Sequence, residues 1–274
     1  MEAMPQDEYV LGTYDEEVDR LGLQHRVWRS WVTDLWKRAG VNVGQQVLDV
    51  GAGPGYAAVD LAQLVGPTGR VVAAELSDRF VDIGRDRAAT QGLDNVEYRQ
   101  MDLVLEELGP DKFDVAWCRW VLSFVSDPGK VVKKVAESLQ PGALFLIHEY
   151  LEYSTWTFMP PQPQQSDFCA LTIKNWKDAG GDPNIGMRLP QLLSDAGLVV
   201  REARPVLFTI RPSDYAWQWP LAWIKSSSKR LVETGDMTKP QADQLLHEFE
   251  TMGQDPGSIM LSPSVIEIIA ERTT

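Results

Sequence analysis

Apolar positions recur along the chain in two alternating patterns, which together predict a regular succession of strands and helices. Short apolar runs, typical of buried strands, are separated by segments in which apolar residues recur every three or four positions, as on one face of a helix. The expected strands are 46–50, 70–75, 95–100, 113–118 and 143–149, and the expected helices between them are 55–65, 78–90 and 128–139. Strands that alternate with helices pair in parallel and carry helices on both faces, so the pattern predicts an α/β fold.

A further helix is predicted before the first strand. Thr13 and Glu16 have the spacing of a capping box at its start, and acidic residues fill its first turn. The helix is expected to run to Arg38, and Gln24 and His25 lie within its apolar stripe. These two polar side chains are therefore expected on the inner face of the helix.

The regular alternation stops at Glu152. Residues 153–183 are rich in proline and aromatic side chains, and we expect them to be ordered because large aromatic residues need burial. The remaining pattern predicts a helix at 186–196, a strand at 198–210, two helices within 213–255 with the second opening at Thr238, and a last strand at 264–271.

A glycine-rich turn joins the first strand to the helix that follows it. Gly51, Gly53 and Gly55 come directly after the strand. Glycine allows the backbone to approach a ligand closely, and the N–H groups at the helix start face the turn, so the arrangement suits a nucleotide-like ligand. The dinucleotide fingerprint G-x-G-x-x-G/A needs a third small residue that packs the helix on the strand. Tyr56 occupies that position here, which disfavours a nicotinamide-dependent oxidoreductase, the second enzyme hypothesis.

With Asp49 before it, the turn reads D-x-G-x-G-x-G and resembles motif I of the class I S-adenosylmethionine (SAM) methyltransferases. The resemblance is most specific over residues 41–150, and the segments 12–28 and 180–186 resemble the small-molecule branch of the ubiquinone/menaquinone-biosynthesis type. It implies a Rossmann-like, seven-stranded, mostly parallel sheet whose last strand is antiparallel, together with an N-terminal lid helix and helical cap insertions. It also implies SAM as cofactor and S-adenosylhomocysteine (SAH) as product.

The resemblance divides the chain into a core and its additions. The pattern of the chain makes residues 1–12 a loose arm. The implied parts are a lid helix within 1–40, a SAM-binding core at 41–152, an insert at 153–185, continued core at 186–212, a helical cap at 213–258 and a final core strand at 259–274.

Cofactor contacts are carried over from the family position by position. Glu75 would accept hydrogen bonds from the ribose hydroxyls, and Asp102 would accept one from the adenine amino group. Asp49 would lie near the amino group of SAM, and Arg119 lies at the carboxyl edge of the sheet, where open α/β folds bind ligands. The alternatives are a solvated strand end for Glu75, a turn acid for Asp102, a buried acid without ligand contact for Asp49 and a structural ion pair for Arg119. The full set of candidates is Asp49, Gly51, Ala52, Gly53, Gly55, Glu75, Leu76, Asp102, Leu103, Arg119 and Gln24.

Methyl transfer from SAM needs a base only if the acceptor atom loses a proton. The candidates for such a base are His25, His148, Glu149, Tyr14 and Tyr150. His25 would titrate near neutrality, and a core histidine bonded within the protein is the alternative. His148 and Glu149 are adjacent in a strand, so one of the two should face the cleft.

Aromatic side chains after the fifth strand could form the wall of a pocket for a flat or apolar acceptor, with simple core packing as the alternative. The candidates for contact with the acceptor are Tyr150, Trp156, Trp176, Trp217 and Trp223, and Trp219 lies in the same expected helix as the last two. As a group they favour a small apolar molecule over a macromolecule.

Composition and charge agree with a small-molecule enzyme. The 274 residues include 26 Lys and Arg against 39 Asp and Glu, for a formal charge of −13, and a field of that sign repels nucleic acid and anionic membrane surfaces. The chain shows no long apolar run and no secretory signal, and its two cysteines are expected to be free thiols, so we expect a cytoplasmic protein. No cluster of acids suggests a metal site, and a homo-oligomer is compatible with this composition. Because motif I reports binding only, a non-catalytic SAM-binding protein is the alternative to an enzyme.

Overall fold

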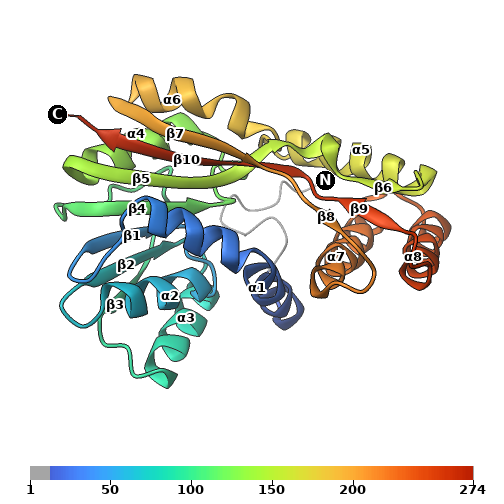
Figure 1. Ribbon diagram of the computed structural model, residues 1–274, viewed down its shortest axis with the longest axis horizontal. Helices are drawn as coiled ribbons and strands as arrows, with labels where there is room; N and C mark the ends of the chain where they lie inside the picture. The colour runs from blue at the N-terminus through green and yellow to red at the C-terminus, as the bar shows by residue number, and fades with distance from the viewer. Residues whose placement is uncertain (1–12, 274) are drawn as a thin grey trace.

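The computed structural model describes residues 13–273, so the arm expected at residues 1–12 lies outside the described part of the chain. Its main element is a seven-stranded sheet in the order β3-β2-β1-β4-β5-β10-β7 (Figure 1). The strands are β1 (Gln46–Val50), β2 (Arg70–Glu75), β3 (Val96–Gln100), β4 (Phe113–Arg119), β5 (Leu139–Glu152), β7 (Leu198–Val206) and β10 (Ser264–Arg272). Within this sheet β10 runs antiparallel to both β5 and β7, and the other pairs are parallel. The predicted Rossmann-like fold with an antiparallel last strand is confirmed.

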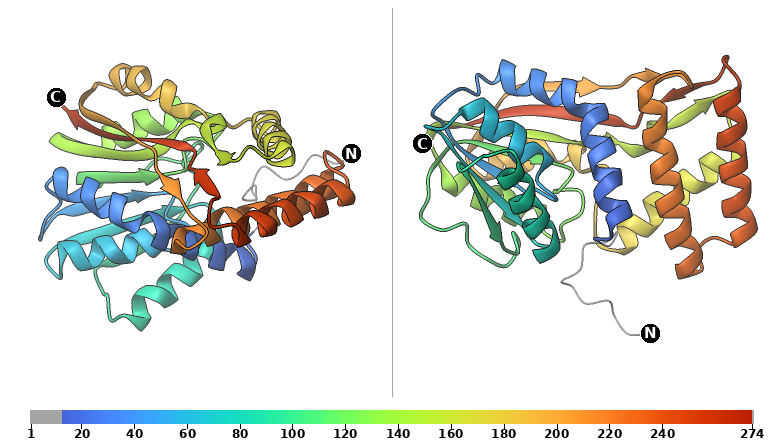
Figure 2. Two further views of the ribbon diagram at one scale, coloured as in Figure 1. Left: turned by 45° about the vertical axis from the view of Figure 1, so that its right-hand side comes forward. Right: turned by 90° about the horizontal axis from the view of Figure 1, so that it is seen from below.

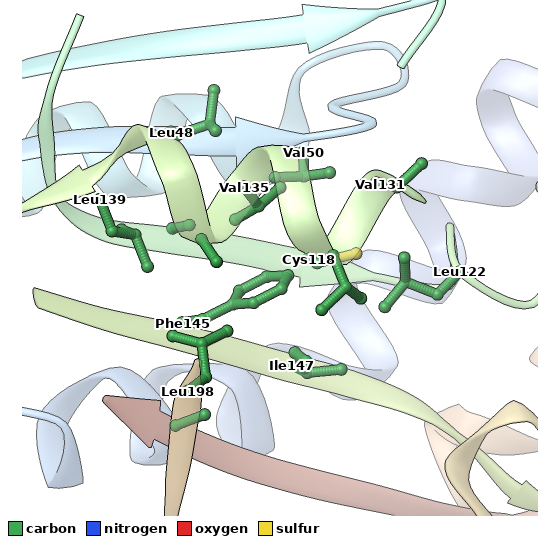
Figure 3. Close-up of a cluster of buried hydrophobic side chains, with 14 of the residues drawn as sticks. Leu48, Val50, Cys118, Leu122, Val131, Val135, Leu139, Phe145, Ile147 and Leu198 are labelled. Carbon is green, nitrogen blue, oxygen red and sulfur yellow. The ribbon is translucent and has the colours of Figure 1, made fainter. Parts of the chain in front are cut away.

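Helices cover both faces of the sheet. One face is covered by α1 (Asp15–Arg38), α2 (Tyr56–Val65) and α3 (Asp78–Thr90), and the other by α4 (Pro128–Ser138) and α6 (Leu189–Asp195). Successive side chains of a strand point to opposite faces, so Val47 packs in the first of these cores and Leu48 and Val50 in the second. Figure 3 shows the second core, where α4 lies over β1, β4 and β5. Burial on both faces explains the continuous apolar runs in these strands.

The starts of the helices show where local sequence decides the structure. Ser77 accepts a hydrogen bond from the N–H of Phe80, and Asp127 accepts one from the N–H of Lys130, as expected for N-cap residues. The capping box predicted at Thr13 is wrong. Tyr14 is the N-cap of α1 and its side chain makes no capping bond, because the helix begins at residue 15 and Thr13 lies one position too early.

A second, three-stranded sheet extends from the end of the first in the order β6-β9-β8. Its strands are β6 (Thr157–Met159), β8 (Thr209–Ile210) and β9 (Ile259–Leu261). The single strand expected at 198–210 is therefore wrong, because the chain leaves the main sheet after Val206 and resumes as β8 in the small sheet. Val206 and Ile210 both bury their side chains in the aromatic cluster beyond the sheet, which explains the change of partner.

Three helices attached to the small sheet form the cap. They are α5 (Pro163–Asp178), α7 (Gln218–Thr234) and α8 (Lys239–Gln254), joined to their neighbours through the 3₁₀ turns η1 (Tyr153–Thr155), η2 (Ile185–Met187) and η3 (Tyr215–Trp217). The helix expected at 186–196 is divided between η2 and α6. Figure 2 shows α1 between the core and the cap, where it packs against α7. The cap and the core thus enclose the carboxyl ends of the main strands.

Candidate functional site

A cavity of about 630 Å³ lies between the carboxyl ends of β1, β2, β4 and β5 and the cap. Its lining falls into two groups. The turn group comes from the ends of the core strands and comprises Asp49, Gly51, Ala52, Gly53, Glu75, Leu76, Met101, Asp102 and Leu103. The aromatic group comes from the loop after β4, from β5 and from the cap, and comprises Trp120, Phe124, Tyr150, Tyr153, Trp156, Trp176, Trp219 and Trp223.

The glycine turn takes a backbone conformation that side chains disfavour. Gly51, Gly53 and Gly55 have φ angles of 68°, 56° and 82°, in the left-handed region that glycine adopts readily. A Cβ at Gly51 would lie 2.3 Å from the side chain of Val121, and one at Gly55 would lie 2.3 Å from the hydroxyl of Tyr98. A Cβ at Gly53 would meet nothing within 4 Å. Gly51 and Gly55 thus pack against the protein, whereas Gly53 faces open space.

Glu75 is tied to the turn by backbone hydrogen bonds. The N–H of Gly53 donates to Oε2 at 2.8 Å and the N–H of Ser77 donates to Oε1 at 2.9 Å. The side chain is buried, and this burial raises the pKa of the carboxyl above its usual value, while the backbone donors act in the opposite direction. The carboxylate is thereby fixed at the cavity wall, with lone pairs left over for a ligand.

Asp49 and Arg119 bring opposite charges to the middle of the cavity. Burial raises the pKa of Asp49 to about 7, and the positive charge of Arg119 partly opposes this shift. Burial also lowers the pKa of Arg119 to about 10. Asp49 Oδ2 and Arg119 Nη1 are both buried and have no hydrogen-bond partner among residues 13–273. Buried polar atoms of this kind normally have partners, so the pair is suited to a zwitterionic ligand group.

His25 connects Arg119 to the surface of α2. Arg119 Nη2 lies 3.2 Å from Nδ1 of His25, and Nε2 of His25 lies 3.1 Å from Oδ2 of Asp60. This arrangement fits a neutral ring that accepts from the guanidinium at Nδ1 and donates from Nε2 to the carboxylate. Burial lowers the pKa of His25, which favours the neutral form. The ring is absent from the cavity lining, in keeping with the structural alternative.

Three further base candidates, His148, Glu149 and Tyr14, are also absent from the lining that the described residues form, whereas Tyr150 lines the cavity. His148 is fully buried, with its ring edge-to-face against Trp28 and Trp120. Glu149 is also fully buried and accepts the N–H groups of the loop after β4. Tyr14 is 73% exposed. The expectation that either His148 or Glu149 faces the cleft is wrong, because helices and loops cover both faces of β5 at this level.

Asp102 has a structural role in addition to its place in the lining. Its Oδ1 accepts the N–H groups of Val104 and Leu105 at 2.7 and 3.0 Å, so the acid closes the turn after β3. Leu76 and Leu103 line the cavity beside it, and Gln24 lines it from α1. Of the cofactor candidates, Gly55 is the one that supports the turn from outside the lining.

The aromatic group forms a continuous wall. Trp120 stacks on Tyr150 with ring centroids 5.4 Å apart, and Phe124 stacks on Trp176 at 4.3 Å. Trp219 donates its indole N–H to Oε1 of Gln24 at 3.2 Å, which joins the cap to α1. Tyr150, Trp156, Trp176 and Trp223 line the cavity as expected of acceptor contacts, whereas Trp217 packs on Phe249 away from it.

The sequence pattern does not single out several of the lining residues, among them Arg20, Phe124, Tyr153 and Arg230. Helical periodicity offers a signal for two of them. Arg20 precedes Gln24 by one turn of α1, and Arg230 follows Trp223 by two turns of α7, so each shares a helix face with a candidate. Neither spacing is informative until the face that meets the cavity is known.

Comparison with known proteins places the chain in a family. The sequence model described as "Methyltransferase domain" matches residues 42–179, half of the chain. The chain belongs to this methyltransferase family. The family resemblance seen at motif I is thereby confirmed. Among the described residues, none of the helices is long and apolar enough to span a membrane, and residues 13–273 hold no cluster of metal-ligating side chains.

Curated relatives of this methyltransferase include the ubiquinone/menaquinone biosynthesis C-methyltransferase UbiE of Pseudomonas putida strain GB-1. It is 34% identical over 143 residues, which are 52% of this chain and 55% of the relative. The chain thus spans about half the length of the curated relatives that it matches.

Solved structures of other proteins resemble most of the fold. Geranyl diphosphate C-methyltransferase from Streptomyces coelicolor A3(2) is 17% identical, with a TM-score of 0.57 over 90% of this chain and 80% of that one. The [4+2]-cyclase SpnF is 18% identical, with a TM-score of 0.56 over 88% of this chain and 79% of that one. At these identities the likeness concerns the fold alone.

Proposed function

We propose that this chain is a SAM-dependent methyltransferase that transfers a methyl group to a small, aromatic or apolar metabolite. One observation carries the proposal. A single cavity has the glycine turn and the Glu75 carboxylate at one side and a wall of aromatic rings at the other. A cofactor and an acceptor could therefore lie next to each other in a space closed by the cap.

Side chains of the turn group, together with Arg119, could contact each part of SAM. Glu75 would accept from the ribose hydroxyls, and Asp102 with Leu103 would contact the adenine. The unpartnered Oδ2 of Asp49 would accept from the ammonium of the methionyl end, and the unpartnered Nη1 of Arg119 would donate to its carboxylate. Gly53 faces the open space that the cofactor would fill.

The chemistry asked of the protein is chiefly positioning. The methyl group of SAM is attached to a sulfonium and is already electrophilic, so transfer is an in-line displacement by the acceptor atom. Holding both molecules in line can contribute on the order of 7–11 kcal/mol in favourable cases. Burial raises the pKa of Tyr150, so its hydroxyl stays protonated and acts as a hydrogen-bond donor rather than a base. The acceptor atom would thus supply its own lone pair.

The class of partner is inferred from the charge of the chain. A net charge of −13 opposes binding to nucleic acid or to an anionic membrane surface. We therefore infer an enzyme of small molecules rather than of RNA, and its cytoplasmic location stays a prediction.

Calorimetric titration of the purified chain with SAH, and separately with NADH, tests the proposal. We expect SAH to bind and NADH not to bind. Gly53→Ala should weaken SAH binding by roughly tenfold or more, because the new methyl group would project into the space of the cofactor. Gly92→Ala is a matched control, since Gly92 also has a left-handed φ, of 65°, and open space around its Cβ, but lies outside the cavity. NADH binding without SAH binding would favour the oxidoreductase.

Turnover distinguishes an enzyme from a non-catalytic SAM-binding protein. Incubation with methyl-labelled SAM and a metabolite extract should transfer label to a small molecule in the wild-type chain and much less in Gly53→Ala. Tight SAH binding with no label transferred from any extract would favour the binding protein and count against the enzyme.

A further inference from the structure

Charged side chains are divided unevenly between the two groups that line the cavity. The acids of the lining are Asp49, Glu75 and Asp102, and all three belong to the ends of the core strands. On the aromatic side, the described lining includes the cations Arg20 and Arg230 and neither an acid nor a histidine. The charged lining residues on the acceptor side are therefore cations, although the chain as a whole carries a net charge of −13. A third lining cation, Arg119, lies with Asp49 between the two sides.

Arg20 is already neutralised within the protein. Its Nε and Nη2 donate to the two carboxylate oxygens of Glu17, each at 2.6 Å, and its Nη1 donates to Oε1 of Gln24 at 3.0 Å. The guanidinium also lies 5.3 Å from the ring centre of Trp223. This cation thus covers one aromatic face of the cavity and has its own counter-ion.

Arg230 has no such counter-ion. It is half-buried, and no described residue forms a hydrogen bond or an ion pair with it. Burial lowers its pKa, and the more distant charge of Glu233 only partly opposes this. A partly desolvated guanidinium without a partner is unfavourable, and its planar array of donors matches a carboxylate. An anion in the cavity would remove this unfavourable state.

The position of Arg230 on α7 sets the distance between this cation and the cofactor side of the cavity. Trp219, Trp223 and Arg230 follow one face of the helix, and Trp219 is bonded to Gln24 beside the turn group. Arg230 lies two turns beyond Trp223, about 10 Å along the helix axis. An anionic group paired with Arg230 is therefore remote from the atom that would receive the methyl group.

We propose that the acceptor is an aromatic or apolar molecule with a carboxylate at the end remote from the methylated atom, and that Arg230 binds this carboxylate. The inference rests on the proposed function and names its substrate class. An acceptor with an ammonium group would suit the aromatic wall through cation–π contacts. Arg230 would repel such a group, and the face of Trp223 is already covered by Arg20.

Binding of three matched probes to the full chain saturated with SAH tests this inference. Phenylhexanoate, phenylhexanol and phenylhexylamine share a ring and an alkyl chain and differ in their terminal charge. Quenching of tryptophan fluorescence reports binding, because several tryptophans line the cavity. We expect the carboxylate to bind about tenfold more tightly than the alcohol or the amine, as for one charge-assisted pair.

Three variants assign the preference to Arg230. Arg230→Gln should abolish the preference for the carboxylate, and Arg230→Lys should retain part of it. Lys229→Gln removes the same charge from the exposed neighbouring position and should leave the preference unchanged. Calorimetry with SAH should give equal cofactor affinity for all four chains, which separates this inference from the proposed function.

Two results would overturn the inference while SAH still binds. One is equal or weaker binding of the carboxylate, including no detectable binding, relative to the alcohol and the amine. The other is a preference for the carboxylate that survives in Arg230→Gln. Failure of SAH to bind the wild-type chain would instead contradict the proposed function.

Discussion

At the scale of single residues, Glu149 is the buried acid that shapes the cavity without lining it. Its Oε1 accepts the N–H groups of Val121 and Leu122, both at 2.7 Å. This loop carries Trp120 into the cavity with a φ of 51°, the one positive φ outside glycine among residues 13–273. Val121 in turn packs against Gly51 of the glycine turn. Glu149 therefore acts as a positioning residue for both sides of the cavity.

Removing this carboxylate should destabilise the chain measurably. Glu149→Ala leaves the buried N–H of Leu122 and the partly buried N–H of Val121 without an acceptor, and we expect the free energy of unfolding to fall by about 2–5 kcal/mol. Glu149→Gln keeps an acceptor oxygen, so its free energy of unfolding should fall clearly less. Chemical denaturation followed by fluorescence measures both values. Equal losses in the two variants would show that the acceptor role is wrong.

The ionisation of Glu149 makes the stability of the chain depend on pH, and the direction of this dependence can be predicted. Burial raises its pKa from 4.5 to about 7. The folded state therefore holds this proton more tightly than the unfolded state, so the contribution to stability is full below pH 4.5 and is lost as the pH rises to about 7. The stability of the wild-type chain minus that of Glu149→Gln should fall across this window by up to about 1.4 kcal/mol per pH unit. A difference that is constant or rises with pH would contradict the assignment.

At the scale of elements, helix α1 is held over the glycine turn by Tyr56. The tyrosine hydroxyl donates to the carbonyl oxygen of Val18 at 3.2 Å, and a Cβ on Gly22 would lie 2.4 Å from that hydroxyl. The guanidinium of Arg87 lies 3.7 Å from the centre of the same ring. The large residue that argued against a dinucleotide fingerprint thus has a positive role, because it positions the helix that closes the cavity.

The contact between Gly22 and Tyr56 predicts that an alanine substitution in α1 destabilises the chain, opposite to the usual effect in a helix. Gly→Ala in a helix interior normally stabilises by up to about 1 kcal/mol, but Gly22→Ala should destabilise the chain and weaken SAH binding because it pushes α1 away from Tyr56. Gly129 of α4 is the control, since its Cβ would make only ordinary contacts at 3.5 Å and alanine should be tolerated. Thermal unfolding and calorimetry with SAH measure both effects. A stabilised Gly22→Ala with normal SAH affinity would show that α1 does not depend on this contact.

How much the sequence could predict depends on the range of the interactions involved. Strands such as β1 and β2 are buried on both faces and are followed by local turn signals. The pattern of apolar residues is therefore sufficient to predict these strands. The small sheet was not predictable, because β8 has two residues and β6 and β9 have three each, too few for a recognisable period. Their pairing depends on where the long strands of the main sheet end.

The same distinction applies to the site. Gly53 and Glu75 lie near each other along the chain, and the family motif placed both at the cavity. The sequence alone leaves the role of His25 open, because its partners Asp60 and Arg119 are 35 and 94 residues away. The sequence does not indicate Arg230, because the face of α7 that meets the cavity depends on how the cap packs against α1. Local motifs therefore indicated the cofactor side, and tertiary packing decides the acceptor side.

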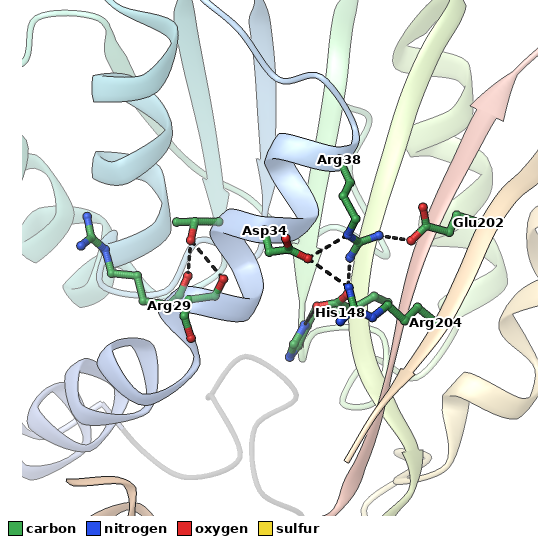
Figure 4. A network of polar contacts seen from close by, with 9 residues as sticks. Arg29, Asp34, Arg38, His148, Glu202 and Arg204 are labelled. Carbon is green, nitrogen blue, oxygen red and sulfur yellow. Dashed lines mark hydrogen bonds and ion pairs between the residues drawn. The ribbon is translucent and has the colours of Figure 1, made fainter. Parts of the chain in front are cut away.

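At the scale of the whole molecule, a polar network joins the first helix to the last strand (Figure 4). Arg38 of α1 pairs with Asp34, with Glu202 of β7 and with Glu267 of β10, and Asp34 also pairs with Arg204. Glu267 is 1% exposed, and its second oxygen lies 3.7 Å from Nδ1 of the buried His148. The network fixes α1, and with it one wall of the cavity, to the far edge of the sheet.

Breaking this network at Arg38 should destabilise the entire fold. Arg38→Met leaves the buried carboxylate of Glu267 without its cation, and removing one partner of a buried ion pair typically lowers the free energy of unfolding by about 3–5 kcal/mol. Adding Glu267→Gln removes the unpaired charge, so the double variant should be more stable than Arg38→Met alone. Urea denaturation of the three chains gives the coupling between the two positions.

An exposed pair between the same two strands provides the control. Arg201 of β7 donates to Glu271 of β10 at 2.8 Å, and both side chains are in contact with solvent. Arg201→Met should leave the free energy of unfolding almost unchanged, because exposed ion pairs are screened by water and salt. If Arg201→Met were as damaging as Arg38→Met, the stabilisation would come from strand pairing in general. If only Arg38→Met destabilises the chain and Glu267→Gln rescues it, the burial of Glu267 is what makes the attachment of α1 strong.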